Sequence, residues 1–564
     1  MAKKIVVVGG VAAGASAAAK ARRDDEHAEI VVLEKGPYVS FANCGLPYFV
    51  SGEIEGRDEL LLQTPESLRS RMALDVRVHH EAVAVHADRR EVEVVDHASG
   101  TRQTIGYDEL VLAPGARPIV PPLPGVKSTN VHLLRTVPDA DALRAALDAG
   151  ARRAVVIGGG FIGLEAAEGL RHRGLEVTLV EKAPQVLPPV DPEMAAPVAD
   201  ELVRLGIDLR LGVGATRFVT AGDRAIAAEL EDGSLIEADL FLLSIGVRPN
   251  VELAVAAGCA LGPTGAIAVD ERMATSVPGI WAAGDAVEMR HLVGDAPVWI
   301  ALAGPANRQG RVAGANTVGG DLRFRGALGT AIVRVGRLTA ASTGLSEKAC
   351  ARGGIECRVT WNRHGHHAGY FPGAQPLTLK LVSDKKTGRL LGAQAVGAEG
   401  VDKRIDVVAT ALHGGLSVAD LEDLDLAYAP PFGAARDPIH QAAMTHHNLQ
   451  KGVLSGLTPS EALERLHALQ VVDVRNPGER AGGMLAGAIG IPLTELRERI
   501  GELEPAKETL VYCAGGQRSA FAARVLRQRG FAQVHTLVGG WAAYGMFEAA
   551  RMHAAPRAPA AAAS

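Results

Sequence analysis

Two stretches of the chain share one order of apolar and polar positions. Residues 5–8 are apolar and are followed by a glycine-rich turn, an alanine-rich segment to about residue 23 and a second apolar run over residues 30–33. Residues 154–181 ("AVVIGGGFIGLEAAEGLRHRGLEVTLVE") repeat this order, with the second apolar run at 177–180. Short apolar runs on both sides of a helical segment predict a parallel strand–helix–strand unit. The pattern predicts two such α/β units.

The first turn carries part of a dinucleotide-binding signature. Gly9, Gly10 and Gly14 follow the first strand, although Val11 stands where the middle glycine of G-x-G-x-x-G is usual. Glycines let the backbone approach a pyrophosphate, the helix N-terminus favours its charge, and Glu34 at the end of the second strand can accept a bond from a ribose hydroxyl.

The second turn carries the complete signature. Gly158, Gly160 and Gly163 are in full register, and Glu181 follows the second strand. A carboxylate at this place accepts from a free 2′-hydroxyl and repels a 2′-phosphate, which predicts NADH as the nucleotide. Lys182 follows directly, and a neighbouring cation leaves NADPH possible.

The pattern changes in the second half of the chain. Residues 326–450 contain alternating runs ("GTAIVRVGRLTAAST", "LTLKLVSDKKTGRLLGAQAVG") and then a helical segment, which predicts an α+β module with an antiparallel sheet. After an expected linker at 451–459, an independent α/β unit is predicted over 460–550. Residues 551–564 ("RMHAAPRAPAAAAS") are of low complexity and are expected to be disordered.

Composition narrows the class of protein. A chain of 564 residues is long enough for three or four domains, and its net charge of -5 includes no basic arm, so we expect no nucleic-acid partner. No segment has the roughly 20 uninterrupted apolar residues of a membrane helix. The glycines of the first turn argue against a signal peptide at the amino terminus. An odd number of scattered cysteines favours a reducing compartment, the cytoplasm, over a disulfide framework; they are Cys44, Cys259, Cys350, Cys357 and Cys513.

Cys44 is a candidate nucleophile without a second cysteine nearby in the sequence. It precedes a Gly-Leu-Pro that is expected to enter a helix, and a helix N-terminus favours a thiolate. The alternative is a small buried hydrophobe. A solitary reactive thiol either cycles through sulfenic acid or forms a mixed disulfide with a substrate thiol. Ser16, Lys20 and Arg23 share one helix face, which either clamps phosphates or is simply solvated.

Cys513 is a second candidate nucleophile. It ends a predicted strand and is followed by Ala-Gly-Gly-Gln-Arg, so successive backbone N–H groups can curl around its sulfur. We expect the following helix N-terminus and Arg518 to stabilise a thiolate or persulfide. Phosphate-transfer enzymes use a similar anion cradle, and phosphatase chemistry is the alternative.

Two further segments, "YDELVLAPGARP" (107–118) and "TSVPGIWAAGDAVE" (275–288), complete an ordered set of motifs. With them, residues 1–450 resemble the pyridine nucleotide-disulfide oxidoreductases. The resemblance implies an FAD-binding domain at 1–149 and 256–325, an NAD-binding domain at 150–255 and a dimerisation domain at 326–450. The cofactor-binding positions it implies are Gly9, Gly10, Ala12, Ala13, Gly14, Glu34, Lys35, Ala113, Pro114, Gly115, Gly158, Gly160, Phe161, Ile162, Gly163, Glu181, Gly246, Gly284 and Asp285.

Within that family, "SFANCGLPYF" and the opening glycine turn resemble the coenzyme A disulfide reductases. The first turn lacks the histidine of the related peroxidases, which disfavours a peroxidase. The resemblance implies a head-to-tail homodimer in which Tyr370 and Tyr428 reach the partner subunit's Cys44. The positions it implies for coenzyme A and substrate binding are Ser16, Lys20, Arg23, Ser40, Asn43, Asn307 and Arg436.

The last α/β unit, with "DVRNPGER", "GAIGIPL" and "LVGGWAAYG", resembles a rhodanese domain in which Cys513 carries sulfane sulfur. The fused order implies an α/β enzyme with FAD and NADH as cofactors that reduces coenzyme A persulfide, polysulfide or coenzyme A disulfide through Cys44. Three alternatives stay open: a coenzyme A disulfide reductase for thiol balance, a protein that is mainly a sulfurtransferase, and an NADH oxidase or peroxidase. No metal site is expected.

Overall fold

The computed structural model describes residues 2–555, and the chain folds as two compact units. The first unit comprises the chain up to Val180 together with Gly206–Asp208 and Gly214–Gly329, and the second comprises Glu181–Leu205, Leu209–Val213 and the chain from Thr330 onward. No helix among the described residues is long and apolar enough to cross a membrane. The expected α/β architecture with an added α+β module is confirmed.

A parallel sheet in the order β18-β7-β1-β2-β3 forms the core of the first predicted α/β unit. Its apolar strands are buried on both faces, as parallel strands require. An antiparallel sheet of three strands packs against it through shared core residues. The strands are β1 (Lys4–Val8), β2 (Glu29–Leu33), β3 (Asp75–Arg77), β7 (Glu109–Leu112) and β18 (Ile280–Ala282), with β4 (His80–His86), β5 (Glu91–Asp96) and β6 (Arg102–Gly106) in the second sheet.

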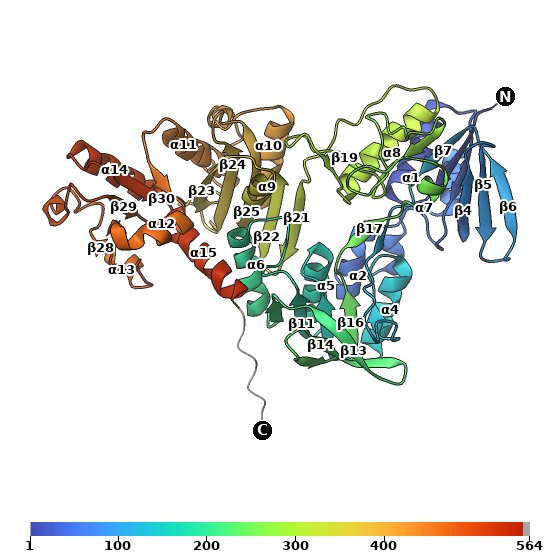
Figure 1. Ribbon diagram of the computed structural model, residues 1–564, viewed down its shortest axis with the longest axis horizontal. Helices are drawn as coiled ribbons and strands as arrows, with labels where there is room; N and C mark the ends of the chain where they lie inside the picture. Colours follow the sequence, from blue (N-terminus) through green and yellow to red (C-terminus); the bar gives the residue numbers. More distant parts are fainter. Residues whose placement is uncertain (1, 556–564) are drawn as a thin grey trace. The chain divides into compact units, whose positions relative to one another are not determined.

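Helices α1 (Ala12–Asp24) and α8 (Ala303–Thr317) cross in close contact on this sheet (Figure 1). A Cβ on Gly310 would lie 2.1 Å from the Ala13 carbonyl oxygen, and one on Gly314 would lie 2.1 Å from that of Ala17. Small residues on both helices therefore bring the two backbones together. The remaining elements here are η1 (Asn43–Gly45), α2 (Leu46–Ser51), η2 (Arg57–Leu60), α3 (Pro65–Met72), β8 (Ala116–Pro118), β17 (Val247–Pro249), α7 (Glu252–Ala256), β19 (Met289–Arg290) and β20 (Pro297–Val298).

The second predicted α/β unit is built around β10, which pairs in parallel with β11 and β16. Helix α5 follows β10 after the glycine turn, as the sequence pattern predicts. The elements are β9 (Val131–His132), α4 (Val137–Asp148), β10 (Arg153–Ile157), α5 (Phe161–His172), β11 (Glu176–Glu181), α6 (Pro192–Arg204), β12 (Asp208–Leu211), β13 (Ala215–Ala221), β14 (Arg224–Leu230), β15 (Leu235–Glu237) and β16 (Leu240–Leu243).

The α+β module has an antiparallel sheet in the order β21-β22-β25-β24-β23. The two alternating runs of the sequence form four of its strands, and β23 was not predicted. Helix α10 covers β22 and β25, while α11 packs against β23. The elements are β21 (Ala331–Val335), β22 (Leu338–Gly344), α9 (Glu347–Arg352), β23 (Cys357–Gly365), β24 (Pro376–Asp384), β25 (Leu390–Gly397), α10 (Val401–His413), η3 (Asp420–Glu422) and α11 (Pro438–Gln450).

The last domain has a parallel sheet in the order β26-β30-β29-β27-β28. Strand β26 lies inside the expected linker at 451–459. Helix α15 continues to Ala554, so residues 551–554 of the expected tail are helical, whereas 556–564 lie outside the described residues. The elements are β26 (Gly456–Leu457), α12 (Pro459–Arg465), η4 (Leu466–Ala468), β27 (Gln470–Asp473), α13 (Pro477–Arg480), β28 (Ile489–Gly490), η5 (Ile500–Glu502), β29 (Thr509–Tyr512), α14 (Gln517–Gln528), β30 (Val534–Leu537) and α15 (Gly540–Ala554).

Candidate active sites

The first glycine turn is shaped for close backbone approach. Gly9 has a φ of +96°, and a Cβ there would lie 2.1 Å from the Ala113 carbonyl oxygen. A Cβ on Gly14 would lie 1.8 Å from the Gly9 carbonyl oxygen. Helix α1 begins at Ala12, and Val11 directly before it forms no capping hydrogen bond through its side chain. The first N–H groups of the helix therefore have no side-chain cap. These groups form the anion-binding end that a pyrophosphate requires.

Glu34 stands at the end of β2 beside this turn. Gly10 donates its N–H to one carboxylate oxygen at 2.9 Å, and Gly36 donates to the other at 2.8 Å. Lys35 is exposed next to it. Ala113 donates its N–H to the Val8 carbonyl at 2.8 Å, so the predicted 113–115 segment is held against β1. The 113–115 segment and the first glycine turn, which were predicted from separate motifs, therefore lie at the same end of β1.

Asp285 follows β18 and forms an ion pair with Arg135 at 2.9 Å. The Asp285 carbonyl accepts from Trp299 Nε1 at 2.8 Å, which fixes the backbone of this loop. Gly284 has a φ of +85°, and a Cβ there would lie 2.8 Å from the Ala13 methyl group. Asp285 was predicted from its motif, whereas Arg135 was not, because nothing near it in the sequence marks it.

The second glycine turn repeats the geometry of the first. Gly158 has a φ of +111°, and a Cβ there would lie 2.4 Å from the Ser244 carbonyl oxygen. A Cβ on Gly163 would lie 1.9 Å from the Gly158 carbonyl oxygen. Gly160 faces open space with no atom within 4 Å of such a Cβ. The turn leaves its outer face free for a ligand, at the N-terminus of α5, where Phe161 and Ile162 begin the helix.

Two other predicted nucleotide contacts lie at strand ends. Glu181 is the last residue of β11, and it accepts the N–H of Ala183 at 2.7 Å. Gly246 has a φ of +107° in the segment between β16 and β17. The roles of both residues in nucleotide binding, and the choice between NADH and NADPH, stay predictions.

Cys44 lies in the short turn η1, immediately before α2, and its side chain is exposed. The surrounding protein nevertheless desolvates the thiolate and raises its pKa above 9.0, and the Glu165 carboxylate raises the pKa further. Arg135 acts in the opposite direction, and Asp285 adds to the increase. Burial and the neighbouring carboxylates therefore oppose the expected effect of the helix N-terminus on this thiol.

The polar stripe on α1 is partly tied to its neighbours. Ser16 donates to Asn307 Oδ1 on α8 at 2.7 Å, which joins two of the predicted coenzyme A contacts. Lys20 pairs with Asp24 at 2.5 Å, and Arg23 is exposed. Arg23 therefore keeps the accessible cation that a phosphate contact requires.

Two more predicted contacts flank Cys44. Asn43 Nδ2 donates to the Arg135 carbonyl at 3.3 Å. Ser40 has a φ of +47°, a left-handed conformation that is uncommon outside glycine. Such strain is frequent at functional turns, and here it places the chain directly before the Cys44 turn.

The two predicted tyrosines lie together in the α+β module. Tyr370 and Tyr428 are 58 positions apart in the sequence, and their hydroxyl oxygens are 3.0 Å apart. Both rings are exposed, Tyr370 to 76% and Tyr428 to 48%. The hydrogen bond to Tyr428 raises the pKa of Tyr370 above 10.0. Arg436 is also exposed, and its carbonyl accepts from Gln441 Nε2 at 3.0 Å.

Cys513 directly follows β29, and one backbone N–H of the predicted cradle points at its sulfur. The Gly516 N–H donates to Cys513 Sγ at 3.1 Å, and the thiol lies 3.7 Å from Ser519 Oγ. Trp541 donates its N–H to the Cys513 carbonyl at 2.8 Å, so α15 also holds this residue. The side chain is only 1% exposed, and its sulfur is enclosed by its own loop.

Arg518 has a partner that the sequence did not predict. Its guanidinium forms two hydrogen bonds to the Glu479 carboxylate, at 2.6 and 2.7 Å. This pairing lowers the pKa of Glu479 to about 2 and, with a smaller effect of Cys513, raises the pKa of Arg518. Arg518 is therefore shared between Glu479 and the sulfur rather than devoted to Cys513.

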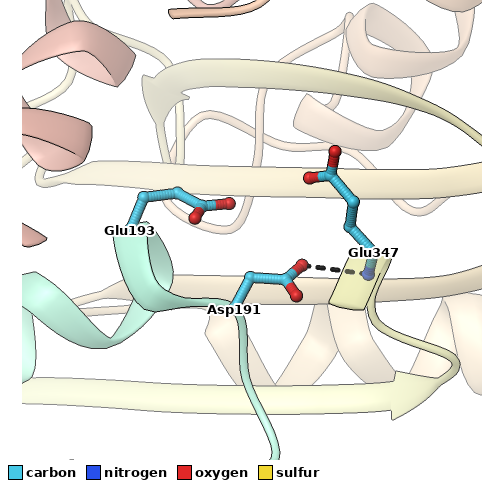
Figure 2. Close-up of side chains that lie close together, drawn as sticks. All are labelled: Asp191, Glu193 and Glu347. Carbon is cyan, nitrogen blue, oxygen red and sulfur yellow. Dashed lines mark hydrogen bonds between the residues drawn. The ribbon is translucent and has the colours of Figure 1, made fainter. Parts of the chain in front are cut away.

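Three carboxylates that were not predicted gather in the second unit (Figure 2). Asp191 and Glu193 come from the start of α6, and Glu347 begins α9 and donates its N–H to Asp191 at 3.1 Å. The Lys380 ammonium lies among them at 2.8, 2.5 and 2.6 Å and is fully buried. Burial alone would lower the Lys380 pKa, but the three carboxylates outweigh it and raise the pKa. A lysine already supplies the cation of this cluster.

Three family models match successive parts of the chain. The pyridine nucleotide-disulphide oxidoreductase model matches residues 3–310, the dimerisation domain of that family matches 330–438, and the rhodanese-like domain matches 458–546. The first match covers more than half of the chain. The chain therefore belongs to the pyridine nucleotide-disulphide oxidoreductase family and carries a C-terminal rhodanese-like domain.

Individual relatives extend this assignment. The chain is 36% identical over 440 residues to a curated NAD(P)H coenzyme A polysulfide/persulfide reductase from Pyrococcus horikoshii, covering 78% of this chain and 97% of the relative. The structure of this chain is similar to that of reduced CoADR-RHD from Bacillus anthracis, with 42% identity and a TM-score of 0.94. The match covers 97% of this chain and 98% of the other. It is also similar to the structure of an NAD-dependent persulfide reductase from A. fulgidus, with 38% identity and a TM-score of 0.91. That match covers 96% of this chain and 100% of the other.

Proposed function

We propose that this protein is an FAD-dependent oxidoreductase that uses NADH to reduce coenzyme A persulfide, polysulfide and coenzyme A disulfide through Cys44. The observation that carries the proposal is the isolation of an accessible thiol. Cys44 is exposed beside the charged pair of Arg135 and Asp285, whereas the other cysteine of its unit, Cys259, is buried against Thr275. A solitary nucleophile leaves the resolving thiol to the substrate.

FAD fits the first glycine turn, where the closely packed Gly9 and Gly14, the uncapped start of α1 and the Glu34 carboxylate match its pyrophosphate and ribose. When bound, FAD supplies the two-electron path from NADH to a disulfide. The second turn, with Gly160 open and Glu181 at the strand end, would hold the nicotinamide nucleotide. Glu181 favours NADH, and NADPH remains the second choice because of Lys182.

Cys44 performs the sulfur chemistry in this proposal. Its thiolate attacks the sulfur attached to coenzyme A in the persulfide, a Cys44–S–S–CoA bond forms, and hydrosulfide leaves with the electron pair of the broken bond. With coenzyme A disulfide, the leaving group is the coenzyme A thiolate. Two-electron cleavage of the mixed disulfide then returns the Cys44 thiolate and releases CoASH.

Polar residues on α1 and α8 are proposed to hold coenzyme A. Ser16 and Asn307 already bond to each other, and Arg23 offers an accessible cation to a phosphate. Lys20 is released for the same role if it exchanges Asp24 for a phosphate. Nearer the thiol, Ser40 and Asn43 would position the end of the arm, and Arg436 completes the proposed set.

A homodimer completes the proposed site. The match to a dimerisation domain over residues 330–438 supports it. Tyr370 and Tyr428 present bonded, exposed hydroxyl groups that would serve the partner subunit's Cys44 by protonating or hydrogen-bonding the leaving sulfur. We place the enzyme in the cytoplasm, because a reducing compartment keeps these thiols free.

Cys513 is proposed to collect sulfane sulfur and deliver it to the reductase. The N–H of Gly516 already points at its sulfur, and Arg518 lies close enough to stabilise a persulfide anion. Joining a sulfur carrier and a sulfur reductase in one chain raises the local concentration of the shared substrate.

Mass spectrometry of the purified protein tests the proposal. We expect a disulfide adduct with the mass of coenzyme A on Cys44, released by dithiothreitol and absent from the Cys44→Ser variant. The kcat/KM values for coenzyme A persulfide and coenzyme A disulfide with NADH then separate a persulfide reductase from a reductase for thiol balance. A Cys44 that is found only as a sulfenic acid, with rapid oxygen or peroxide consumption, would contradict the proposal and indicate an oxidase or peroxidase.

A further inference from the structure

An open pocket of about 800 Å³ lies next to the loop that carries Cys513. Its walls come from β23 and β24 of the dimerisation domain, α15 of the rhodanese-like domain, and α6, all within the second unit. Ala514 and Gly515, which follow Cys513, line it. A Cβ on Gly515 would lie 3.2 Å from the Arg363 carbonyl oxygen, so the loop packs directly on the end of β23. The pocket joins the sulfur-carrying loop to elements from outside its own domain.

The pocket lining carries one cation, Arg363, and one carboxylate, Asp200, of which the carboxylate already has a side-chain partner. Its titratable side chains are Arg363, His364 and Asp200. The Asp200 carboxylate lies 2.8 Å from His553 Nε2 and is engaged by that ring. Burial lowers the pKa of His364, so this imidazole is neutral at pH 7. Arg363 forms no ion pair with any acidic side chain in the part of the chain that the structure describes.

Arg363 has the surroundings of a binding cation. Its side chain is exposed to solvent at the end of β23, yet the protein around it desolvates the guanidinium and lowers its pKa. This combination is expected for a cation at the wall of a concave site. A guanidinium without a carboxylate partner can form two parallel hydrogen bonds to a phosphate or carboxylate of a ligand.

The remaining walls and the volume indicate an organic ligand. Trp541, Met546, Ala549 and Pro197 give the pocket an apolar lining. Pockets of about 300–1,000 Å³ hold ligands the size of a cofactor fragment. A small inorganic donor such as thiosulfate would leave most of this space empty and would make no use of the apolar walls. A thiol with a long arm and anionic groups matches both the volume of the pocket and its apolar walls.

We propose that the pocket binds the arm of an organic persulfide of the coenzyme A type, with Arg363 holding one of its anionic groups while its terminal sulfur reaches Cys513. This inference rests on the proposed function, because it assigns the same thiol to the second sulfur site. It adds a specificity residue, Arg363, that the rhodanese-like domain does not itself contain.

The transfer needs no outside oxidant or reductant. The Cys513 thiolate attacks the terminal sulfur of the persulfide R–S–S⁻, and a new S–S bond forms at Cys513. The S–S bond of the donor breaks, and its electron pair leaves on the thiolate R–S⁻. The product is the Cys513 persulfide. The reverse step loads coenzyme A from a Cys513 persulfide that an inorganic donor has formed.

Steady-state sulfur transfer from thiosulfate to two acceptors tests the pocket. The full-length protein is assayed with coenzyme A and with cyanide, and the ratio of the two kcat/KM values is compared among variants. Arg363→Glu should lower the ratio about tenfold or more through the KM for coenzyme A, the loss expected for one charge-assisted hydrogen bond. Arg363→Lys should restore most of it. Ala549→Trp should lower it by filling the pocket.

The control carries the same charge change elsewhere. Arg497 is exposed in the rhodanese-like domain and does not line the pocket, so Arg497→Glu should leave the ratio within about twofold, as surface charges contribute little. Thermal unfolding of each variant verifies that it is folded. A ratio that is the same in the native protein, Arg363→Glu and Ala549→Trp would overturn the proposal.

Pantetheine as a third acceptor identifies the anionic group. It shares the arm of coenzyme A and lacks the phosphates, so Arg363→Glu should affect coenzyme A and spare pantetheine; equal losses would overturn the role of Arg363 in holding a phosphate. NADH-driven reduction of soluble coenzyme A persulfide by Cys513→Ser tests the proposed function separately. If this reduction is absent while the ratio of kcat/KM values depends on Arg363, the proposed function alone is refuted. If the reduction is present while the ratio does not depend on Arg363, the pocket alone is refuted.

Discussion

The reactivity of Cys44 depends on charges that lie far from it in the sequence. Desolvation and the Glu165 carboxylate raise its pKa, and Arg135 lowers it. Tyr48 donates its hydroxyl to Glu165 at 3.0 Å, which holds this carboxylate of α5 near the turn that carries Cys44. A thiol with a raised pKa is mostly protonated at neutral pH and resists oxidation. Attack on a substrate then depends on local cations.

Replacing Glu165 should activate this thiol. Glu165→Gln removes a negative charge that raises the Cys44 pKa, so we expect the rate of alkylation by iodoacetamide to rise at a lower pH than in the native protein. Arg135→Met removes the opposing charge and should shift the profile to higher pH. Alkylation of Cys44, followed by peptide mass spectrometry over a range of pH, measures both shifts.

The matched control is Glu55→Gln, the same change at an exposed position that does not influence the Cys44 pKa. Its profile should coincide with that of the native protein. An unchanged Glu165→Gln profile would show that Glu165 does not set the reactivity, and a shift to higher pH would contradict the direction assigned to its charge.

At this scale the sequence predicted the reacting groups but not their partners. Cys44, Asp285 and the turn glycines are marked by local spacing, whereas Arg135 is an ordinary residue after β9 that meets Asp285 across 150 positions. Glu165 and Glu479 are equally unmarked. The helix-dipole argument for Cys44 was incomplete for the same reason, since it left out these tertiary contacts.

Among secondary-structure elements, a buried ionic cluster connects two helices to a strand. Asp191 precedes α6 and Glu347 begins α9, positions where a carboxylate also interacts favourably with the helix dipole. Lys380 on β24 supplies the opposite charge and lies over the Trp361 ring at 5.2 Å. Burial alone would raise the Asp191 pKa, but Lys380 and several hydrogen bonds hold it below 3.8.

Removing Lys380 should destabilise the second unit in a pH-dependent way. Lys380→Met leaves buried carboxylates without a cation, a change that typically costs about 3–5 kcal/mol of unfolding free energy. In the variant these carboxylates acquire raised pKa values, so the folded state binds protons more readily than the unfolded state. The deficit relative to the native protein should be largest at pH 8 and shrink as the pH falls toward 5.

Denaturant unfolding at several pH values measures this deficit. Lys385→Met is the control, because Lys385 lies exposed beyond the end of the same strand. In the native protein the Asp191 contribution has the opposite sign: it is present above pH 3.8 and is lost as the pH falls below that value. A Lys380→Met deficit that is constant with pH would mean that the carboxylates are hydrated rather than buried.

The periodicity of apolar residues predicted most of the helices and strands. It did not predict those in which apolar and polar residues follow no clear period. The two strand–helix–strand units and the strands around residues 331–397 follow clear apolar patterns. β23 ("CRVTWNRHG") combines buried and charged positions, because its end contacts the loop of Cys513, and the sequence alone did not identify it. The helical residues 551–554 were missed because alanine-rich composition is shared by helices and disordered tails.

In the whole molecule, the two candidate thiols differ in access rather than in chemistry. Cys44 is exposed, whereas Cys513 is enclosed by its own loop and held by α14 and α15. A direct disulfide between them would require that loop to open. In the proposed route, an organic persulfide bound in the neighbouring pocket exchanges sulfur with Cys513 and then serves Cys44, so one substrate thiol is used at both sites.

This division of labour predicts opposite phenotypes for the two cysteines. Cys44→Ser should lower NADH oxidation driven by coenzyme A persulfide by more than about a hundredfold, because the attacking nucleophile is lost. Cys513→Ser should retain reduction of soluble coenzyme A persulfide and lose the activity that starts from thiosulfate and coenzyme A.

Cys259→Ser, at a buried thiol of the first unit outside the proposed chemistry, is the control for loss of a cysteine. NADH consumption and sulfide release are followed together, since one hydrosulfide should appear per NADH with the persulfide. Full activity in Cys44→Ser, or loss of soluble persulfide reduction in Cys513→Ser, would exclude a route in which sulfur passes from Cys513 to Cys44 on coenzyme A.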